Sequence, residues 1–294
     1  MNYSSASVRP GHVTASPSGS RDEVVDLEAL DWNRVWQAQL DKGRSQKRDA
    51  GFWDTRAPSF SKAALETDYV EQLLEIMGPK PHWTAFDMGC GSGAVAIPLA
   101  RHISSVTAVD FSGGMLSALR KRCEAEKVHN VTTIHGGWED DWDTLGITTY
   151  DVAIASRSMV VDDLEASIQK LNAVARKRVF IVTVTGDGPR DRRLFEAIGR
   201  PVTSPGPDYI YYYNMLYHMG LRANVSFIQE KRNRTYESPE DAAASMQWMF
   251  EDLSAREQEK LARYLKEHLV FDSGSWRLSY ANVIRWAVMW WEKE

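Results

Sequence analysis

The sequence predicts an α/β fold: a doubly wound, mostly parallel seven-stranded sheet of the Rossmann-like type. Three observations predict it. Between residues 83 and 199, short apolar segments alternate with amphipathic ones, as in parallel sheets joined by helical crossovers. Three closely spaced glycines follow the first strand segment, and two late strand-like segments indicate an antiparallel edge. We expect a helical N-terminal lid and C-terminal insertions around this sheet.

Composition limits the class of protein. The 294 residues carry 35 Lys and Arg against 40 Asp and Glu, a formal charge of −5, and 43% of them are hydrophobic. These values are typical of a globular chain, and the acidic balance argues against a nucleic-acid partner. No apolar run approaches the ~20 residues of a membrane span. We therefore expect no membrane partner and a cytoplasmic location.

The cysteines and histidines show no metal-ligand spacing. Cys90 and Cys123 are the only two cysteines, and the seven histidines are scattered along the chain. Two cysteines cannot build a disulfide framework, and no Cys/His cluster is present. We expect no bound metal.

The elements are expected in four sections: a flexible tail at 1–21, a helical lid at 22–80, a nucleotide-binding core at 81–185, and a substrate cap with closing strands at 186–294. The lid contains two predicted helices, 22–43 and 66–77, and the second has apolar residues at helical spacing. The core alternates five strands with four helices. The strands are 83–88, 106–110, 131–135, 150–155 and 178–184, and the helices are 94–102, 113–126, 161–175 and 189–199.

The last third of the chain has a different pattern. An aromatic helix is expected at 206–219, and strand-like segments at 224–230 and 277–291. Two helices between them, 239–251 and 254–268, each follow a serine suited to N-capping. This order predicts a sheet finished by an antiparallel edge pair.

The turn after the first strand is the most informative segment. Gly89, Gly91 and Gly93 allow a tight turn and remove the Cβ atoms that would face a ligand. The next helix directs its N-terminal N–H groups into the same crevice. Asp110 ends the second strand about 20 residues further on, where a carboxylate accepts ribose hydroxyl groups in such folds.

Two nucleotide cofactors fit this spacing. Gly89, Gly91 and Ala94 also satisfy the dinucleotide pattern GxGxxG/A, so a nicotinamide dinucleotide stays open. However, Asp87 places a carboxylate two residues before the first glycine. That charge would repel a diphosphate and attract the ammonium group of an amino acid. A P-loop is excluded because no GK[ST] follows.

The run DMGCGSG…AVDFSGGML, within residues 86–115, resembles the cofactor half of class I S-adenosylmethionine-dependent methyltransferases. The similarity extends over roughly residues 50–185. It implies S-adenosylmethionine as cofactor, S-adenosylhomocysteine as product, and Asp110 as the ribose ligand. It also implies contacts to the amino-acid part and to adenosine. The residues concerned are Asp87, Gly89, Cys90, Gly91 and Gly93 for the former, with Cys90 a small filler, and Phe111 and Met115 for the latter.

One departure from the family concerns adenine. The family often reads Gly-Asp-Ala after the third strand, whereas Gly137 replaces that Asp here. Backbone groups and Trp138 or Glu139 are then expected to contact adenine, with plain packing as the alternative for Trp138. Ser156 at the end of the fourth strand and Trp53 in the lid complete the predicted cofactor contacts.

Acceptor-binding residues are expected after the fourth and fifth strands, because ligands lie beyond the carboxyl ends of parallel strands. Arg157 is a candidate partner of an anionic substrate or of the cofactor carboxylate, with a structural ion pair as the alternative. Tyr212 is a candidate substrate contact. Tyr213 and His218 are candidate bases, with simple packing as the alternative.

The resemblance implies in-line SN2 methyl transfer to a small-molecule acceptor. Holding the nucleophile at ~3–3.5 Å in line with the methyl group accounts for ~7–11 kcal/mol of the barrier. The alternatives are a nicotinamide-dependent oxidoreductase and a non-catalytic protein that binds S-adenosylmethionine. A homodimer through the C-terminal tryptophans is a further hypothesis.

Overall fold

The computed structural model describes residues 27, 29–43, 49–55, 68–202, 206–232, 234–250 and 252–293. The chain divides into two compact units, Met1–Leu30 and Asp31–Glu294. The predicted tail, 1–21, lies outside the described residues, and the elements below all belong to the second unit. None of the helices in the described ranges is long and apolar enough to cross a bilayer.

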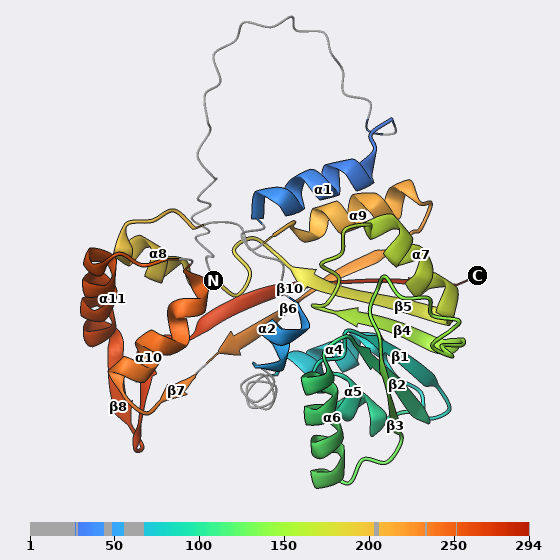
Figure 1. The fold of residues 1–294 in the computed structure, drawn as a ribbon, viewed down its shortest axis with the longest axis horizontal. Coiled ribbons are helices and arrows are strands. Elements are labelled where there is room, and N and C mark those ends of the chain that lie inside the picture. The colour runs from blue at the N-terminus through green and yellow to red at the C-terminus, as the bar shows by residue number, and fades with distance from the viewer. Residues whose placement is uncertain are drawn as a thin grey trace, which may run out of the picture. The chain divides into compact units, whose positions relative to one another are not determined.

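A seven-stranded sheet forms the centre of the second unit, with the order β3-β2-β1-β4-β5-β10-β6 (Figure 1). The first five strands are parallel, whereas β10 runs antiparallel to both β5 and β6. The predicted fold class is confirmed. The strands are β1 (Thr84–Met88), β2 (Ser105–Asp110), β3 (Val131–His135), β4 (Tyr150–Ser156), β5 (Ala175–Val184), β6 (Asn224–Arg232) and β10 (Asn282–Glu292).

Helices cover both faces of this sheet because β1, β4 and β5 are apolar on both sides. One apolar core joins the sheet to α4 (Tyr69–Met77), α5 (Ala96–Ala100) and α6 (Gly113–Ala125). The other core joins it to α1 (Trp32–Gly43), α7 (Leu164–Val174) and α9 (Tyr209–His218). The two groups lie on opposite sides of the sheet in Figure 1.

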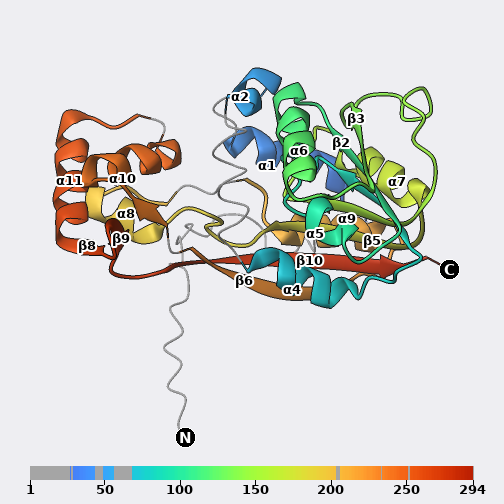
Figure 2. The ribbon, with the colours of Figure 1, turned by 90° about the horizontal axis from the view of Figure 1, so that it is seen from below.

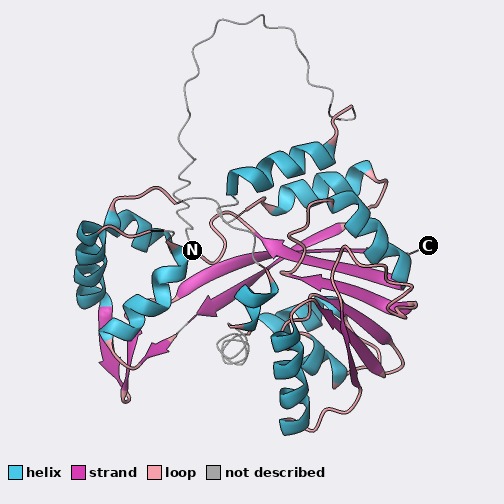
Figure 3. Ribbon diagram, viewed as in Figure 1, coloured by secondary structure: helices cyan, strands magenta, loops and turns pink. Residues whose placement is uncertain are grey.

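A second lobe, which we call the cap lobe, is built from two connections that are distant in the sequence (Figures 1 and 2). The β5–α9 connection supplies α8 (Arg192–Ile198). The β6–β10 connection supplies the rest, including a three-stranded sheet of order β7-β9-β8, drawn in magenta among helices in Figure 3. These elements are β7 (Thr235–Tyr236), α10 (Pro239–Met246), a 3₁₀ turn (Gln247–Met249), α11 (Ala255–His268), β8 (Leu269–Asp272) and β9 (Ser275–Leu278).

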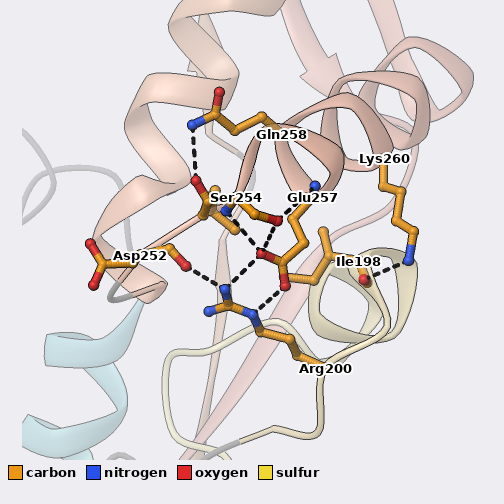
Figure 4. Close-up of polar contacts among 8 residues, drawn as sticks. Ile198, Arg200, Asp252, Ser254, Glu257, Gln258 and Lys260 are labelled. Atoms are coloured by element: carbon orange, nitrogen blue, oxygen red, sulfur yellow. Dashed lines mark hydrogen bonds and ion pairs between the residues drawn. The ribbon is translucent and has the colours of Figure 1, made fainter.

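The cap lobe has its own apolar core, to which α8, α10 and α11 all contribute. Arg200, just after α8, fastens the two connections together (Figure 4). Its guanidinium donates to both carboxylate oxygens of Glu257 at 2.5 and 2.8 Å and to the carbonyl of Asp252. Lys260 donates to the carbonyl of Ile198 at 2.9 Å.

Several element boundaries differ from the predicted ones. The predicted strand 277–291 is wrong as one unit, because β9 ends at Leu278 and β10 begins at Asn282. The small sheet of the cap lobe was not predicted, because its strands have only two to four residues. Both predicted serine caps are confirmed: Ser238 begins α10, and Ser254 forms a full capping box with Glu257.

Candidate functional site

The glycine turn after β1 adopts a backbone that only glycines take readily. Gly89, Gly91 and Gly93 have φ angles of +71°, +55° and +82°. A Cβ on Gly89 would lie 2.3 Å from Cβ of Ser158, and one on Gly93 would meet a leucine of α6 at 2.2 Å. At Gly91 the nearest atom would be 4.0 Å away, the sulfur of Met115. Two of the glycines are therefore needed for packing, whereas Gly91 leaves open space for a ligand.

Asp87 is the most unusual carboxylate of the site. Its side chain is 1% exposed, and within the described residues its Oδ2 is the one buried side-chain polar atom without a hydrogen-bond partner. Burial, helped by the neighbouring charge of Asp110, raises the pKa of Asp87 to about 7. A buried acceptor of this kind is costly unless a donor or a cation pairs with it.

Asp110, at the end of β2, holds the turn in place. Its Oδ2 accepts the backbone N–H of Gly91 at 2.8 Å, and its Oδ1 accepts that of Ser112 at 2.9 Å. Burial raises the pKa of Asp110, and the two backbone donors oppose this. Each carboxylate oxygen has a second lone pair, so the group can accept two ligand hydroxyls as well.

A short helix from the N-terminal region, α2 (Ala50–Asp54), docks on the first turn of α6. Asp54 Oδ1 accepts the hydroxyl of Ser112 at 2.6 Å and the backbone N–H of Gly114 at 2.9 Å. The Ser112 hydroxyl in turn caps α6 by accepting the N–H of Met115. The hydrogen bond from Ser112 lowers the pKa of Asp54. The contact places Trp53, which is half-buried, next to the start of α6.

The predicted adenosine wall is only partly as expected. Phe111 is 40% exposed, and the Cα of Gly137 lies beside it, with 3.6 Å between Phe111 Cβ and the position of an added Cβ. Gly137 donates its N–H to Asp140 at 2.7 Å, so this backbone donor is occupied. Trp138 is buried, and its indole N–H donates to the carbonyl of Ser158 at 3.2 Å. The geometry favours the packing role for Trp138.

A polar cluster lies where β4 ends. The hydroxyl of Ser156 and that of Tyr69, from α4, are 2.6 Å apart. Burial raises the pKa of Tyr69 to about 12, so its hydroxyl is neutral and acts through hydrogen bonds. The guanidinium of Arg157 stacks over Tyr69, 4.3 Å from the ring centre, and lies 3.9 Å from Glu230 Oε2. The structural ion pair expected as the alternative for Arg157 is therefore present.

Of the predicted acceptor-side residues, His218 lies away from this edge, whereas Tyr212 and Tyr213 are packed side chains. His218 is exposed in the last turn of α9, before the chain starts β6 at the edge opposite the glycine turn. Tyr212 is 2% exposed, packs edge-on against Trp36 and donates its hydroxyl to the carbonyl of Met159 at 2.6 Å. Tyr213 packs against the same core. Packing, the alternative expected for Tyr213, is present at both tyrosines, because α9 covers a face of the sheet.

Cys90 sits inside the turn as a buried thiol, and burial raises its pKa well above the ordinary value. A neutral, buried thiol is a filler, as expected for this position. Within the described part of the chain, no group of three or more His, Cys, Asp or Glu side chains is arranged to hold a metal ion.

Sequence reasoning missed the roles of Asp54, Tyr69, Ser158 and Glu230. Each acts through a partner at least 58 residues away in the chain. No local spacing reveals such contacts. The one available signal was an acidic residue, Glu230, in an otherwise half-apolar strand.

Comparisons with known proteins agree with this geometry. The family model of the methyltransferase domain matches residues 85–178. An uncharacterized protein of Haemophilus influenzae is 37% identical over 242 residues, which cover 81% of this chain and 88% of that protein. The 23S rRNA (uracil(1939)-C(5))-methyltransferase of Shewanella sp. (strain ANA-3) is 32% identical over 79 residues, 27% of this chain and 18% of that enzyme.

Among solved structures, a Bacillus halodurans protein provisionally assigned as a methyltransferase has the same fold, with a TM-score of 0.50 and 15% identity. The match covers 76% of this chain and 98% of that one. The sheet order with its single antiparallel strand, the glycine turn, the two acids and the matched family model lead to one conclusion. This chain belongs to the class I S-adenosylmethionine-dependent methyltransferases.

Proposed function

We propose that this chain transfers the methyl group of S-adenosylmethionine to a small-molecule acceptor, bound at the carboxyl edge of the sheet beside the cap lobe. One observation carries the proposal: the buried carboxylate of Asp87 has an oxygen without a partner, next to a turn where Gly91 leaves open space. The ammonium group of an amino acid is the partner that this oxygen lacks.

The residues present fit the cofactor. Asp87 would pair with its ammonium group, Asp110 would accept its ribose hydroxyls, and Phe111 and Met115 would contact its adenosine part. Trp53 and Ser156 remain proposed contacts from α2 and β4. When bound, S-adenosylmethionine supplies a methyl group activated by a sulfonium.

A dinucleotide fits less well. A diphosphate near the glycine turn would meet two buried acids, Asp87 and Asp110, and the charge of Asp110 already raises the pKa of Asp87. Either acid would have to stay protonated to tolerate it. The oxidoreductase alternative is therefore disfavoured by charge.

The chain's own contribution is positioning. Tyr69 and Ser156 present a joined pair of hydroxyls where β4 ends, and the raised pKa of Tyr69 keeps it a hydrogen-bond donor. Residues in these roles orient an acceptor and exclude water, which is most of what an activated methyl group requires. His218 is exposed in the last turn of α9 and Tyr213 packs against the core, so we assign no general base.

The small-molecule part of the proposal is supported by the cap lobe. Two separate connections extend from the carboxyl ends of β5 and β6, where ligands bind in α/β sheets, and fold into one lobe. The net charge of −5 is unfavourable for a long polynucleotide. The homodimer stays a prediction.

Calorimetry tests the proposal. The full chain is titrated with S-adenosylhomocysteine and with NAD, and Asp87→Asn is compared with Glu124→Gln, an exposed residue near the C-terminal end of α6, as a charge-matched control. Binding of the first ligand only, weakened by Asp87→Asn alone, is expected. Binding of NAD instead would refute the cofactor assignment. Methyl-labelled cofactor is then incubated with separate metabolite and RNA extracts. Label transferred only to RNA would refute the small-molecule acceptor.

A further inference from the structure

Four charged residues form a compact group beside the end of β4, which we call the arginine cluster: Arg157, Glu230, Arg232 and Arg234. Glu230 is 3% exposed and lies at its centre. Its Oε1 is 2.8 Å from Nε of Arg232, and its Oε2 accepts the indole N–H of Trp286 at 2.7 Å. Arg157 approaches the same Oε2 at 3.9 Å from the opposite side.

The charges of this cluster do not cancel. Arg157 and Arg232 both approach the one carboxylate of Glu230, and Arg234 adds a third positive charge next to Arg232. Arg234 is half-buried, and no carboxylate of the described residues lies within ion-pairing distance of it. Burial and the two neighbouring guanidiniums, Arg234 and Arg157, lower the pKa of Arg232 although Glu230 opposes them. Unbalanced positive charge in a partly desolvated place is unfavourable unless an anion joins it.

The cluster also has an opening. Arg232 and Arg234 line a hollow between the end of β6 and the cap lobe, together with the aromatic side chains of Tyr236 and Trp248. Trp248 is 41% exposed, so an apolar surface is available to a ligand there. At its other end the cluster reaches Arg157, the residue that follows Ser156 at the carboxyl end of β4. Glu230 thus connects the hollow to the carboxyl edge of the sheet, where β4 ends.

We propose that the methyl acceptor carries an anionic group, a carboxylate or a phosphate, which binds to Arg234 and the neighbouring arginines of the cluster while its aromatic or apolar body lies against the side chains of the hollow. This inference rests on the proposed function and specifies its substrate class. Arginine is suited to the role because its planar fork pairs with both oxygens of such groups.

A small anion fits the cluster better than a polynucleotide does. Of the charged groups next to it, Arg193 is paired with Asp191 at 2.8 Å and Arg277 with Asp272 at 2.8 Å. These two guanidiniums are therefore neutralised by carboxylates, and the partly buried positive charge lies on the arginine cluster. A nucleic-acid site uses an extended basic surface along the phosphate backbone.

The test is calorimetry on the full chain saturated with S-adenosylhomocysteine. The ligands are phenyl phosphate, benzoate and neutral benzamide, with a single-stranded RNA oligonucleotide as the fourth. At least one of the two anions is expected to bind, at least about tenfold more tightly than benzamide. The tighter of the two identifies the group as a phosphate or a carboxylate.

Arg234→Gln is the decisive variant, because Arg234 makes no ion pair with any described residue and its loss should not unfold the protein. It is expected to weaken anion binding about tenfold or more, with melting temperature and S-adenosylhomocysteine affinity unchanged. Arg234→Lys, which keeps the charge and loses the planar fork, provides a second variant should the first fold poorly, and it is expected to weaken anion binding as well. Arg222→Gln is the matched control, since Arg222 is exposed next to the start of β6 at the opposite edge.

Three results would overturn the inference: neither anion binds, benzamide binds equally well, or Arg234→Gln leaves anion affinity unchanged. Oligonucleotide binding that is tighter than both anions and is lost in Arg234→Gln would replace the small anion by a polynucleotide. Failure of S-adenosylhomocysteine to bind would instead contradict the proposed function. In that case the anion titrations, repeated on the unliganded chain, still decide whether the cluster is an anion site.

Discussion

At the scale of single residues, the site is organised around two carboxylates in different situations. Both oxygens of Asp110 already accept backbone N–H groups, so this residue shapes the turn as well as any ligand contact. Asp87 has one oxygen without a partner. Asp110 is a structural acid whose oxygens can still accept further hydrogen bonds. Asp87 is a buried acid that a bound cation would pair with.

The first prediction concerns Asp87→Asn in the unliganded chain. The pKa of Asp87 rises from 3.8 to about 7 on folding, so the folded state holds a proton that the unfolded state has released between these values. The contribution of this group to the free energy of unfolding is therefore largest below the unfolded pKa. It is lost as the pH rises toward 7. We expect Asp87→Asn to be more stable than the natural chain by on the order of 2 kcal/mol near pH 8, and no more stable near pH 4.

Urea unfolding of both proteins across this pH range measures the difference. The variant and the natural chain could instead differ in unfolding free energy by the same amount near pH 4 and near pH 8. That result would show that the pKa of Asp87 is not raised in the folded state. The same variant should weaken S-adenosylhomocysteine binding, because the amide cannot supply the charge that the ammonium needs.

The second prediction concerns Asp110→Ala. Loss of a charged acceptor should cost ~1.5–3 kcal/mol of S-adenosylhomocysteine binding per ribose hydrogen bond. It should also lower the melting temperature, because the N–H groups of Gly91 and Ser112 lose their acceptor. Calorimetry and thermal unfolding are the two measurements. A lower melting temperature with unchanged cofactor affinity would leave Asp110 a purely structural role.

At the scale of elements, α2 is the part of the predicted lid that docks beside the glycine turn, on the first turn of α6. The other described helices of residues 22–80, α1 and α4, pack into the two cores of the sheet. Asp54 attaches α2 to the first turn of α6, where a carboxylate also interacts favourably with the helix dipole. Gly114 permits the approach, since a Cβ there would lie 2.8 Å from Asp54 Oδ1.

The third prediction is that Asp54→Ala releases α2. Amide hydrogen exchange across Ala50–Asp54 should speed up, and S-adenosylhomocysteine should bind more weakly if Trp53 contacts it. Because the pKa of Asp54 is lowered, the docking is complete above the ordinary carboxyl pKa and is lost as pH falls through the lowered value. Asp68→Ala is the control, since the Asp68 side chain makes no cap hydrogen bond. Equal exchange rates in the two variants would argue against this docking.

At the scale of the whole molecule, the cap lobe is a second apolar core attached to the carboxyl edge of the sheet. Its two connections, residues 185–208 and 233–281, are joined by apolar packing and by the Arg200 contacts of Figure 4. The guanidinium of Arg200 lowers the pKa of Glu257 to about 2, so this link persists in moderately acidic solution. Both connections must fold together before the acceptor side is complete.

The fourth prediction is that Arg200→Ala loosens the cap lobe without affecting the sheet. Hydrogen exchange should increase in α8 and in the first turn of α11, while S-adenosylhomocysteine affinity stays within about twofold of the natural value. Arg256→Ala, an exposed neighbour on α11, serves as the control. Increased exchange in β1 and β4 as well would mean that the two lobes unfold together.

Most of the core was predictable because its signals are local. Each strand–helix–strand step of the core extends over about 30 residues, the length of one βαβ unit. The glycine turn after Asp87 and the acid Asp110 at the end of β2 lie within one such step. The two serine caps in the cap lobe were visible for the same reason. Hydrophobic period, glycine geometry and capping depend on neighbours in the sequence.

The sequence by itself thus determined the sheet, the glycine turn and the class of cofactor. Only the tertiary structure decided that Tyr212 packs against Trp36, that His218 lies away from the carboxyl edge of the sheet, and that Arg157 and Arg232 both approach Glu230. It also decided that α8 joins the later insertion in one lobe. The physical reason is that a side chain's role depends on burial and on partners 50 to 130 residues away, and sequence spacing does not encode those distances.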